Sequence, residues 1–213
     1  TNAVLTMDDP NGSGTIYYTL DGADPRLPGG AVNTASAIPY SGAITLSRST
    51  LVKARILSDS TWSALAETTF AVGPVRENLR ITELMYHPAD PNTEFIELLN
   101  VGTEPINLNL VEFTKGVDYV FGDLTLQPGQ YTLIVQDPTA FADRYGSGLP
   151  VAGQYDGRLD NGGERIKLKD AVGTEIQDFD YKDGWYELTD GYGFSLTLVH
   201  PASADPNLWD SKA

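Results

Sequence analysis

Two carboxylates lie in one apolar stretch of the chain, residues 93–100, which reads TEFIELLN. Paired carboxylates serve glycosidases as acid and base when both converge on one bond, at a separation of roughly 5–10 Å. Side chains three residues apart share a face on a helix but take opposite faces on a strand. The aromatic and branched neighbours and the flanking turn signals favour a strand. An enzyme with a Glu94/Glu97 carboxylate pair is therefore the least favoured function.

The same alternation predicts how this strand packs. Ile96 and Leu98 are expected to point into a core, and Glu97 to point outward toward a basic residue or solvent. Glu94 is expected at the start of the strand, near water. The stretch is interpreted as a core strand whose two carboxylates have structural roles.

The histidine and serine residues do not form a recognisable catalytic or zinc-binding motif either. His87 and His200 both precede proline and are interpreted as turn residues. A zinc site needs three or four converging ligands, and the sequence has neither an HExxH motif nor a His/Cys cluster. Ser195 precedes His200 by five residues, but it lies in a strand pattern without a G-x-S-x-G motif. We predict no catalytic residue and no metal-binding residue.

One aromatic cluster is a candidate binding site, in the segment KDGWYELTDGYG. Its members are Trp185, Tyr186, Asp190 and Tyr192. Aromatic rings in a polar loop can stack on sugar faces while a carboxylate binds hydroxyl groups, which would make a glycan-binding module. The favoured interpretation is that Trp185 covers the end of a core, because large aromatic side chains are mostly buried.

Charge is distributed unevenly along the chain, whose formal net charge is −15. Residues 1–75 hold four basic and six acidic residues, a balance of −2, and residues 76–213 hold ten and 23, a balance of −13. This asymmetry indicates two units and disfavours nucleic acid as a partner. Acidic loops could supply oxygen ligands for calcium, but none has EF-hand spacing, so no cofactor is predicted and calcium is left open. These loops contain Asp21 and Asp24, then Asp156, Asp160 and Glu164, then Asp178, Asp180 and Asp183.

The chain has no cysteine, which excludes disulfides, cysteine zinc sites and thiol nucleophiles. No apolar run reaches the roughly 20 residues that a membrane-spanning helix needs. The sequence contains no signal peptide, but it begins abruptly at TNAVLTM. We interpret it as a piece of a longer protein, in which a missing targeting signal means little.

Short strands separated by Gly, Pro and Asp turns must position these residues. In residues 51–57, Val52, Ala54 and Ile56 alternate with basic residues, as in a half-buried strand. The first core is expected to contain Ile16, Tyr18, Leu20, Val52, Ala54, Ile56 and Phe70. One short helix is predicted after Asp137 as N-cap, ending at Gly146. The fold class is all-β, with two β-sandwich domains, 1–73 and 80–213, joined by a linker at 74–79.

The segment TIYYTLDGADPR and the later STLVKAR strand resemble the chitobiase/β-hexosaminidase C-terminal-like domain, also called fibronectin-III-associated. The resemblance covers most of residues 4–72. It implies a noncatalytic β-sandwich of the kind found beside glycoside hydrolases and in secreted multidomain bacterial proteins.

The ordered run ITELMYHP, EFIELLN, INL, PGQY and GERIKL is similar to a lamin-tail domain, over about residues 79–213. The resemblance implies an immunoglobulin-like sandwich without a catalytic motif. The resemblance also implies an extracellular accessory module, which is what such domains look like in bacteria.

These observations favour noncatalytic accessory, adhesion or spacer modules of a larger secreted or cell-surface bacterial protein. The expected location is extracellular or at the cell surface. The expected partners are other domains of the parent protein, with a glycan or another protein as further candidates. No nucleic-acid partner is expected.

Overall fold

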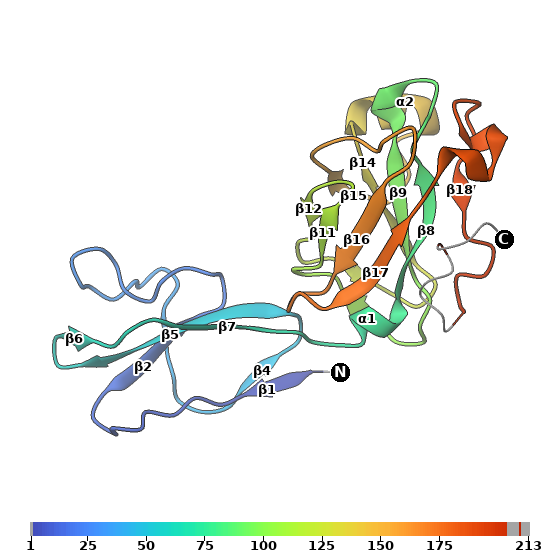
Figure 1. Cartoon of the computed structure of the whole chain (residues 1–213). Coiled ribbons are helices and arrows are strands. Elements are labelled where there is room, and N and C mark those ends of the chain that lie inside the picture. Colours follow the sequence, from blue (N-terminus) through green and yellow to red (C-terminus); the bar gives the residue numbers. More distant parts are fainter. Residues whose placement is uncertain (1, 204–208, 210–213) are drawn as a thin grey trace. The chain divides into compact units, whose positions relative to one another are not determined.

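A computed structural model describes residues 2–203 and 209 of the chain (Figure 1). The chain divides into two compact units, Thr1–Gly73 and Pro74–Ala213. Each unit has its own sheets and its own cluster of buried side chains, so each is described by itself.

The first unit is built from antiparallel strands. Strand β5 is its centre, because β2, β6 and β7 all pair with it, and β3 continues the sheet beside β2. A separate pair joins β1 and β4. The strands are β1 (Ala3–Leu5), β2 (Thr15–Thr19), β3 (Ile38–Pro39), β4 (Ile44–Leu46), β5 (Thr50–Ser58), β6 (Thr61–Trp62) and β7 (Ala66–Phe70).

Alternation along β2 and β5 predicted most of this core. Ile16, Tyr18 and Val52 are buried, and Ala54 and Phe70 pack against the buried cluster as partly buried side chains. Ile56 is half-buried. Leu20 is exposed, so its predicted place in the core is wrong. Strand β2 ends one residue earlier, at Thr19, whose hydroxyl donates to the carbonyl of Ala23 as the chain turns.

A bidentate ion pair holds the long loop after β2. Both oxygens of Asp24 accept from the guanidinium of Arg55 on β5, with Nε at 2.8 Å and Nη2 at 2.7 Å. Asp24 also accepts from the backbone N–H of Arg26. The hydrogen bonds from Arg55 are the main reason why the pKa of Asp24 falls to about 2.

Replacing Arg55 with glutamine should raise the pKa of Asp24 from about 2 toward its ordinary value of 3.8. A lowered carboxylate pKa stabilises the fold above the ordinary pKa, and this contribution is lost as pH falls from 3.8 through about 2. NMR titration of the Asp24 carboxyl group measures the shift, with Lys53→Gln on the same strand as a control. An unchanged pKa in the Arg55 variant would contradict the assignment.

The second unit contains two facing sheets. A four-stranded sheet has the order β12-β11-β16-β17, and a five-stranded sheet has the order β15-β14-β9-β8-β18. All pairs are antiparallel except β14 with β15. A two-stranded pair joins β10 and β13.

The elements of the second unit are as follows in chain order. They are α1 (Val75–Asn78), β8 (Leu79–Met85), η1 (Pro91–Thr93), β9 (Phe95–Asn100), β10 (Ile106–Asn107), β11 (Glu112–Lys115), β12 (Tyr119–Val120), β13 (Thr125–Leu126), β14 (Tyr131–Val135), α2 (Pro138–Tyr145), β15 (Val151–Gln154), β16 (Arg165–Lys169), β17 (Glu175–Asp180), η2 (Asp183–Trp185), η3 (Glu187–Thr189) and β18 (Leu196–Thr197).

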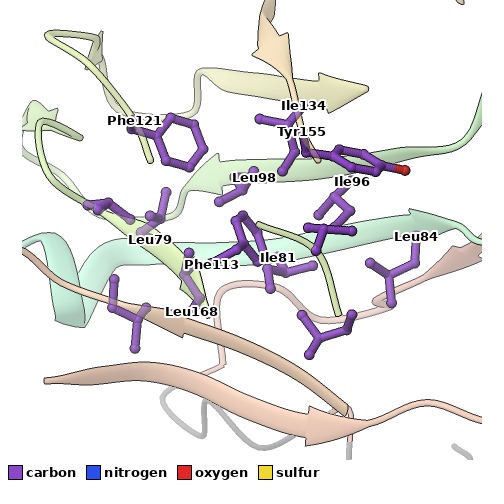
Figure 2. Close-up of a cluster of buried hydrophobic side chains, with 14 of the residues drawn as sticks. Leu79, Ile81, Leu84, Ile96, Leu98, Phe113, Phe121, Ile134, Tyr155 and Leu168 are labelled. Atoms are coloured by element: carbon purple, nitrogen blue, oxygen red, sulfur yellow. The ribbon is translucent and has the colours of Figure 1, made fainter. Parts of the chain in front are cut away.

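The main core lies between the two sheets. Figure 2 shows Ile81, Ile96 and Leu98 of the five-stranded sheet near Phe113 and Leu168 of the four-stranded sheet. Ile96 and Leu98 are completely buried, which confirms their predicted inward orientation. The all-β fold class is therefore confirmed, with period-two burial as its physical basis.

The predicted short helix is α2. The side chain of Asp137 accepts from the N–H groups of Thr139 and Ala140, Pro138 follows it, and Gly146 ends the helix with φ of 94°. Phe141 of α2 packs on the outer face of the five-stranded sheet with Phe95 and three further apolar side chains, Met85, Leu133 and Val135. The structure adds one helical turn, α1, within the segment predicted as linker. None of the described helices has the length and apolar character needed to cross a membrane.

Candidate functional site

The two glutamates of residues 93–100 do not form a pair. Glu94 lies among core residues, whereas Glu97 lies in register with Glu83 of β8 and Leu133 of β14. Leu133 belongs to the cluster that packs under α2, on the outer face of the sheet. The sheet therefore separates the two carboxylates, as the alternation predicted.

Glu94 is buried, with 2% of its side chain exposed, so its predicted position near water is wrong. Its Oε2 accepts from the hydroxyl of Tyr155 at 3.1 Å and from the backbone N–H of Leu159 at 2.9 Å. The guanidinium of Arg158 lies 3.9 Å from Oε1. Tyr155 and Leu159, which follow Glu94 by 61 and 65 residues, cover the start of β9. A local sequence pattern cannot show a contact at this separation.

Burial raises the pKa of Glu94 above its ordinary value. The hydrogen bonds from Leu159 and Tyr155 and the charge of Arg158 oppose this shift without cancelling it. A carboxyl group with a raised pKa could act as a general acid. Here the group is covered and its Oε2 accepts two hydrogen bonds within the fold, so the arrangement stabilises a loop.

The raised pKa makes a prediction about pH. The folded state holds the proton of Glu94 more tightly than the unfolded state, so this group lowers stability as pH rises from 4.5 through the folded pKa. In the Glu94→Gln variant this loss should be absent. Urea unfolding of both proteins across this range, read by hydrogen exchange in β9, measures the difference. A difference that stays constant with pH would contradict the prediction.

A second carboxylate cluster lies on the outer face of the five-stranded sheet. Glu83 is directly opposite Glu97, which accepts from Thr82 Oγ1 at 2.6 Å, and the hydroxyl of Ser195 donates to Glu83. Burial is the main reason for the raised pKa of Glu83; the hydrogen bond from Ser195 opposes the shift and the charge of Glu97 adds to it. A serine bonded to a carboxylate resembles part of a nucleophilic triad, but no hydrogen bond between described residues joins Ser195 to a histidine.

His87 has a partner that its position before proline did not indicate. Its Nδ1 lies 2.6 Å from Oδ1 of Asp190, and its ring packs against Gly191. The neighbouring Tyr86 hydroxyl lies 3.1 Å from Oγ1 of Thr189. Asp190 of the predicted sugar site therefore contacts His87, and together with the Tyr86–Thr189 contact it holds residues 186–191 against the residues that follow β8.

The predicted aromatic cluster is only partly assembled. Trp185 and Tyr186 line one groove of about 450 Å³, whereas Asp190 and Tyr192 are not among its lining residues. Trp185 is half-buried and packs against the main core, as expected of a residue that covers its end. Tyr192 is 66% exposed.

Sequence reasoning missed most of the groove. Its other walls come from segment 194–200, from Leu188 and from Trp209. The alternation of apolar and polar residues in 193–199 predicts a strand, but alternation cannot show that Phe194 and Val199 stay exposed. Their exposure depends on what the rest of the fold leaves uncovered.

A polar hollow of about 620 Å³ is also lined by Trp185. Glu164, Asp180 and Asp183 line it together with Trp185. Within the described part of the chain, no group of three or more His, Asp or Glu side chains is arranged to hold a metal ion.

Comparison with known proteins identifies both units. A family model described as Lamin Tail Domain matches residues 74–183, and one described as Fn3 associated matches residues 4–70. Both are noncatalytic module types, and both predicted resemblances are confirmed. The lamin tail match also supports the immunoglobulin-like description of the second sandwich.

No curated protein matches the chain. Among solved structures, a DUF4876 family protein from Bacteroides thetaiotaomicron is 13% identical, with a TM-score of 0.25. The match covers 60% of this chain and 46% of that one. The family model covers more than half of the chain, so this protein belongs to the lamin tail domain family, with an Fn3-associated module before its lamin tail domain.

Proposed function

We propose that the two units are noncatalytic accessory, adhesion or spacer modules of a larger secreted or cell-surface bacterial protein. The observation that carries this proposal is the presence of two adjacent domains of noncatalytic type. Their partners would be other domains of the parent protein, with a glycan or another protein as further candidates.

The chemistry of the carboxylates supports this proposal. Glu94 is covered by Tyr155 and Leu159, and Glu97 accepts from Thr82 on the other face of the sheet. General acid–base catalysis needs a group within hydrogen-bonding reach of the proton it transfers. Glu94 has a structural role instead, because it accepts hydrogen bonds from two buried donors, the Tyr155 hydroxyl and the Leu159 N–H.

Two experiments test the proposal. The first uses the purified chain with glycan, ester and phosphate substrates. Any turnover should be the same in the unchanged chain and in the Glu94→Gln and Ser195→Ala variants. Turnover that either substitution abolishes would refute the noncatalytic role.

In the second experiment, antibodies against the chain should detect the parent protein on intact cells or in the medium of its source organism. Detection only after lysis would refute the surface location.

Glycan binding is the second candidate function, and one observation favours it. Trp185 presents an aromatic surface beside a hollow that contains Glu164, Asp180 and Asp183, which is a combination suited to sugar rings and hydroxyl groups. A glycan array tests this candidate, with Trp185→Ala as the variant and the exposed Tyr131→Ala as the control. Hits that survive in Trp185→Ala, or an array without hits, would remove it.

A further inference from the structure

An exposed apolar groove lies along β18 of the lamin tail domain. Tyr186, Leu188, Phe194 and Val199 line it and are 42%, 59%, 58% and 71% exposed. Apolar side chains that gather in one exposed hollow usually mark a binding surface. The groove shares only Trp185 with the polar hollow described above.

Three polar side chains that line the groove have hydrogen-bond partners within the fold. Ser195 donates to Glu83, Thr189 Oγ1 donates to the carbonyl of Tyr186 at 2.8 Å, and Trp209 Nε1 donates to the carbonyl of Ile81 at 2.9 Å. A sugar ring needs several polar partners for its hydroxyl groups. The lining therefore favours apolar side chains over a glycan.

The groove follows an open sheet edge. Strand β18 is outermost in the five-stranded sheet, beside β8 (Figure 1), and within residues 2–203 and 209 no strand pairs with its other side. The N–H of Leu198 donates to the carbonyl of Thr82. Because backbone groups alternate in direction along an antiparallel strand, those of Thr197 face away from β8. An extended peptide could pair there and place alternate side chains in the groove.

Charge indicates which peptide fits. Glu187 lies between Tyr186 and Leu188, two residues that line the groove, and residues 185–200 contain no Lys or Arg. Residues 76–213 hold ten basic and 23 acidic residues, a balance of −13. Complementary charge steers association and selects among partners.

We propose that this groove binds an extended protein segment in which apolar side chains alternate with Lys or Arg, by adding a strand to β18. The apolar side chains enter the groove between Leu188 and Phe194. The basic side chains face the acidic surface around it. This binding goes beyond the accessory role proposed above and does not depend on it.

Fluorescence anisotropy with the full chain and a synthetic peptide that alternates Lys with Leu and Phe tests the proposal. Binding should weaken about tenfold in the double variant Leu188→Ser with Phe194→Ser, which removes the apolar contacts. Val120→Ser, at a residue equally exposed on β12 and outside the groove, should bind as the unchanged protein does. A peptide with Glu in place of Lys, and one with Ser in place of Leu and Phe, should each bind about tenfold more weakly.

Several results would overturn the proposal. The first is an absence of peptide binding, or binding that the double variant leaves unchanged. The second is slow hydrogen exchange of the Thr197 amide in the free chain, because it would show an edge that is already paired. Glycan hits or concentration-dependent dimers that the double variant abolishes would assign the groove to a sugar or to a second copy of the chain.

Discussion

Replacing Glu94 with alanine will lower the free energy of unfolding of the lamin tail domain by about 3 kcal/mol. The substitution removes the acceptor for two buried donors, the hydroxyl of Tyr155 and the N–H of Leu159. An unsatisfied buried donor costs about 1–3 kcal/mol, and two are created at once. Loss of the interaction with the partly exposed Arg158 adds little, because solvent screens it.

The measurement must report on one domain, because a chain with two units need not unfold in one step. Hydrogen exchange of β9 as a function of urea gives the free energy of unfolding locally. Glu94→Gln is the matched variant, since its amide oxygen can still accept, and Glu104→Ala at an exposed position is the control for general effects. A loss in Glu94→Ala no larger than in Glu104→Ala would show that Glu94 does not support the fold.

Replacing Trp209 with alanine will destabilise the same domain by about 3–5 kcal/mol. Trp209 is 4% exposed, belongs to the main core and stacks on Phe179, with ring centroids 5.1 Å apart and an angle of 10° between the planes. The variant therefore leaves a large cavity and frees the carbonyl of Ile81 from its hydrogen bond. The matched family model ends at residue 183, yet Trp209 is part of the core.

Trp209→Phe separates the two contributions of this side chain. It keeps an aromatic ring against Phe179 but loses the donor to Ile81, so we expect a smaller loss, of about 1–2 kcal/mol. Hydrogen exchange in β8 and β17 as a function of urea measures both variants. If Trp209→Ala unfolds at the same urea concentration as the unchanged chain, residue 209 is dispensable for the core.

The sequence by itself determined the features that depend on neighbouring residues. Alternation in residues 93–100 was sufficient to orient Ile96, Leu98 and Glu97, because side chains on a strand must alternate between its faces. Asp137, followed by Pro138 and later Gly146, was sufficient to predict α2, because helix ends are set by local hydrogen bonds. The order of motifs along the chain was sufficient to identify both domain families.

Predictions failed where the deciding contact is distant in the chain. Glu94 was expected near water, but Tyr155 and Leu159, which follow it by 61 and 65 residues, cover it. Leu20 was expected in the first core, but the chain turns after Thr19 and leaves it outside. In both cases the residue type fitted the local pattern, and tertiary packing decided its exposure.

The proposed binding surfaces depend entirely on tertiary packing. The aromatic cluster of Trp185, Tyr186, Asp190 and Tyr192 is continuous in sequence, yet His87 engages Asp190 and only Trp185 and Tyr186 reach the groove. Among the described residues, β18 is the outermost strand on this side of its sheet, and the groove lies beside it. Sequence determined which strands form and which of their residues face inward, because these depend on local geometry. Only the tertiary structure decided which residues stay exposed together, because exposure depends on every other segment that could cover them.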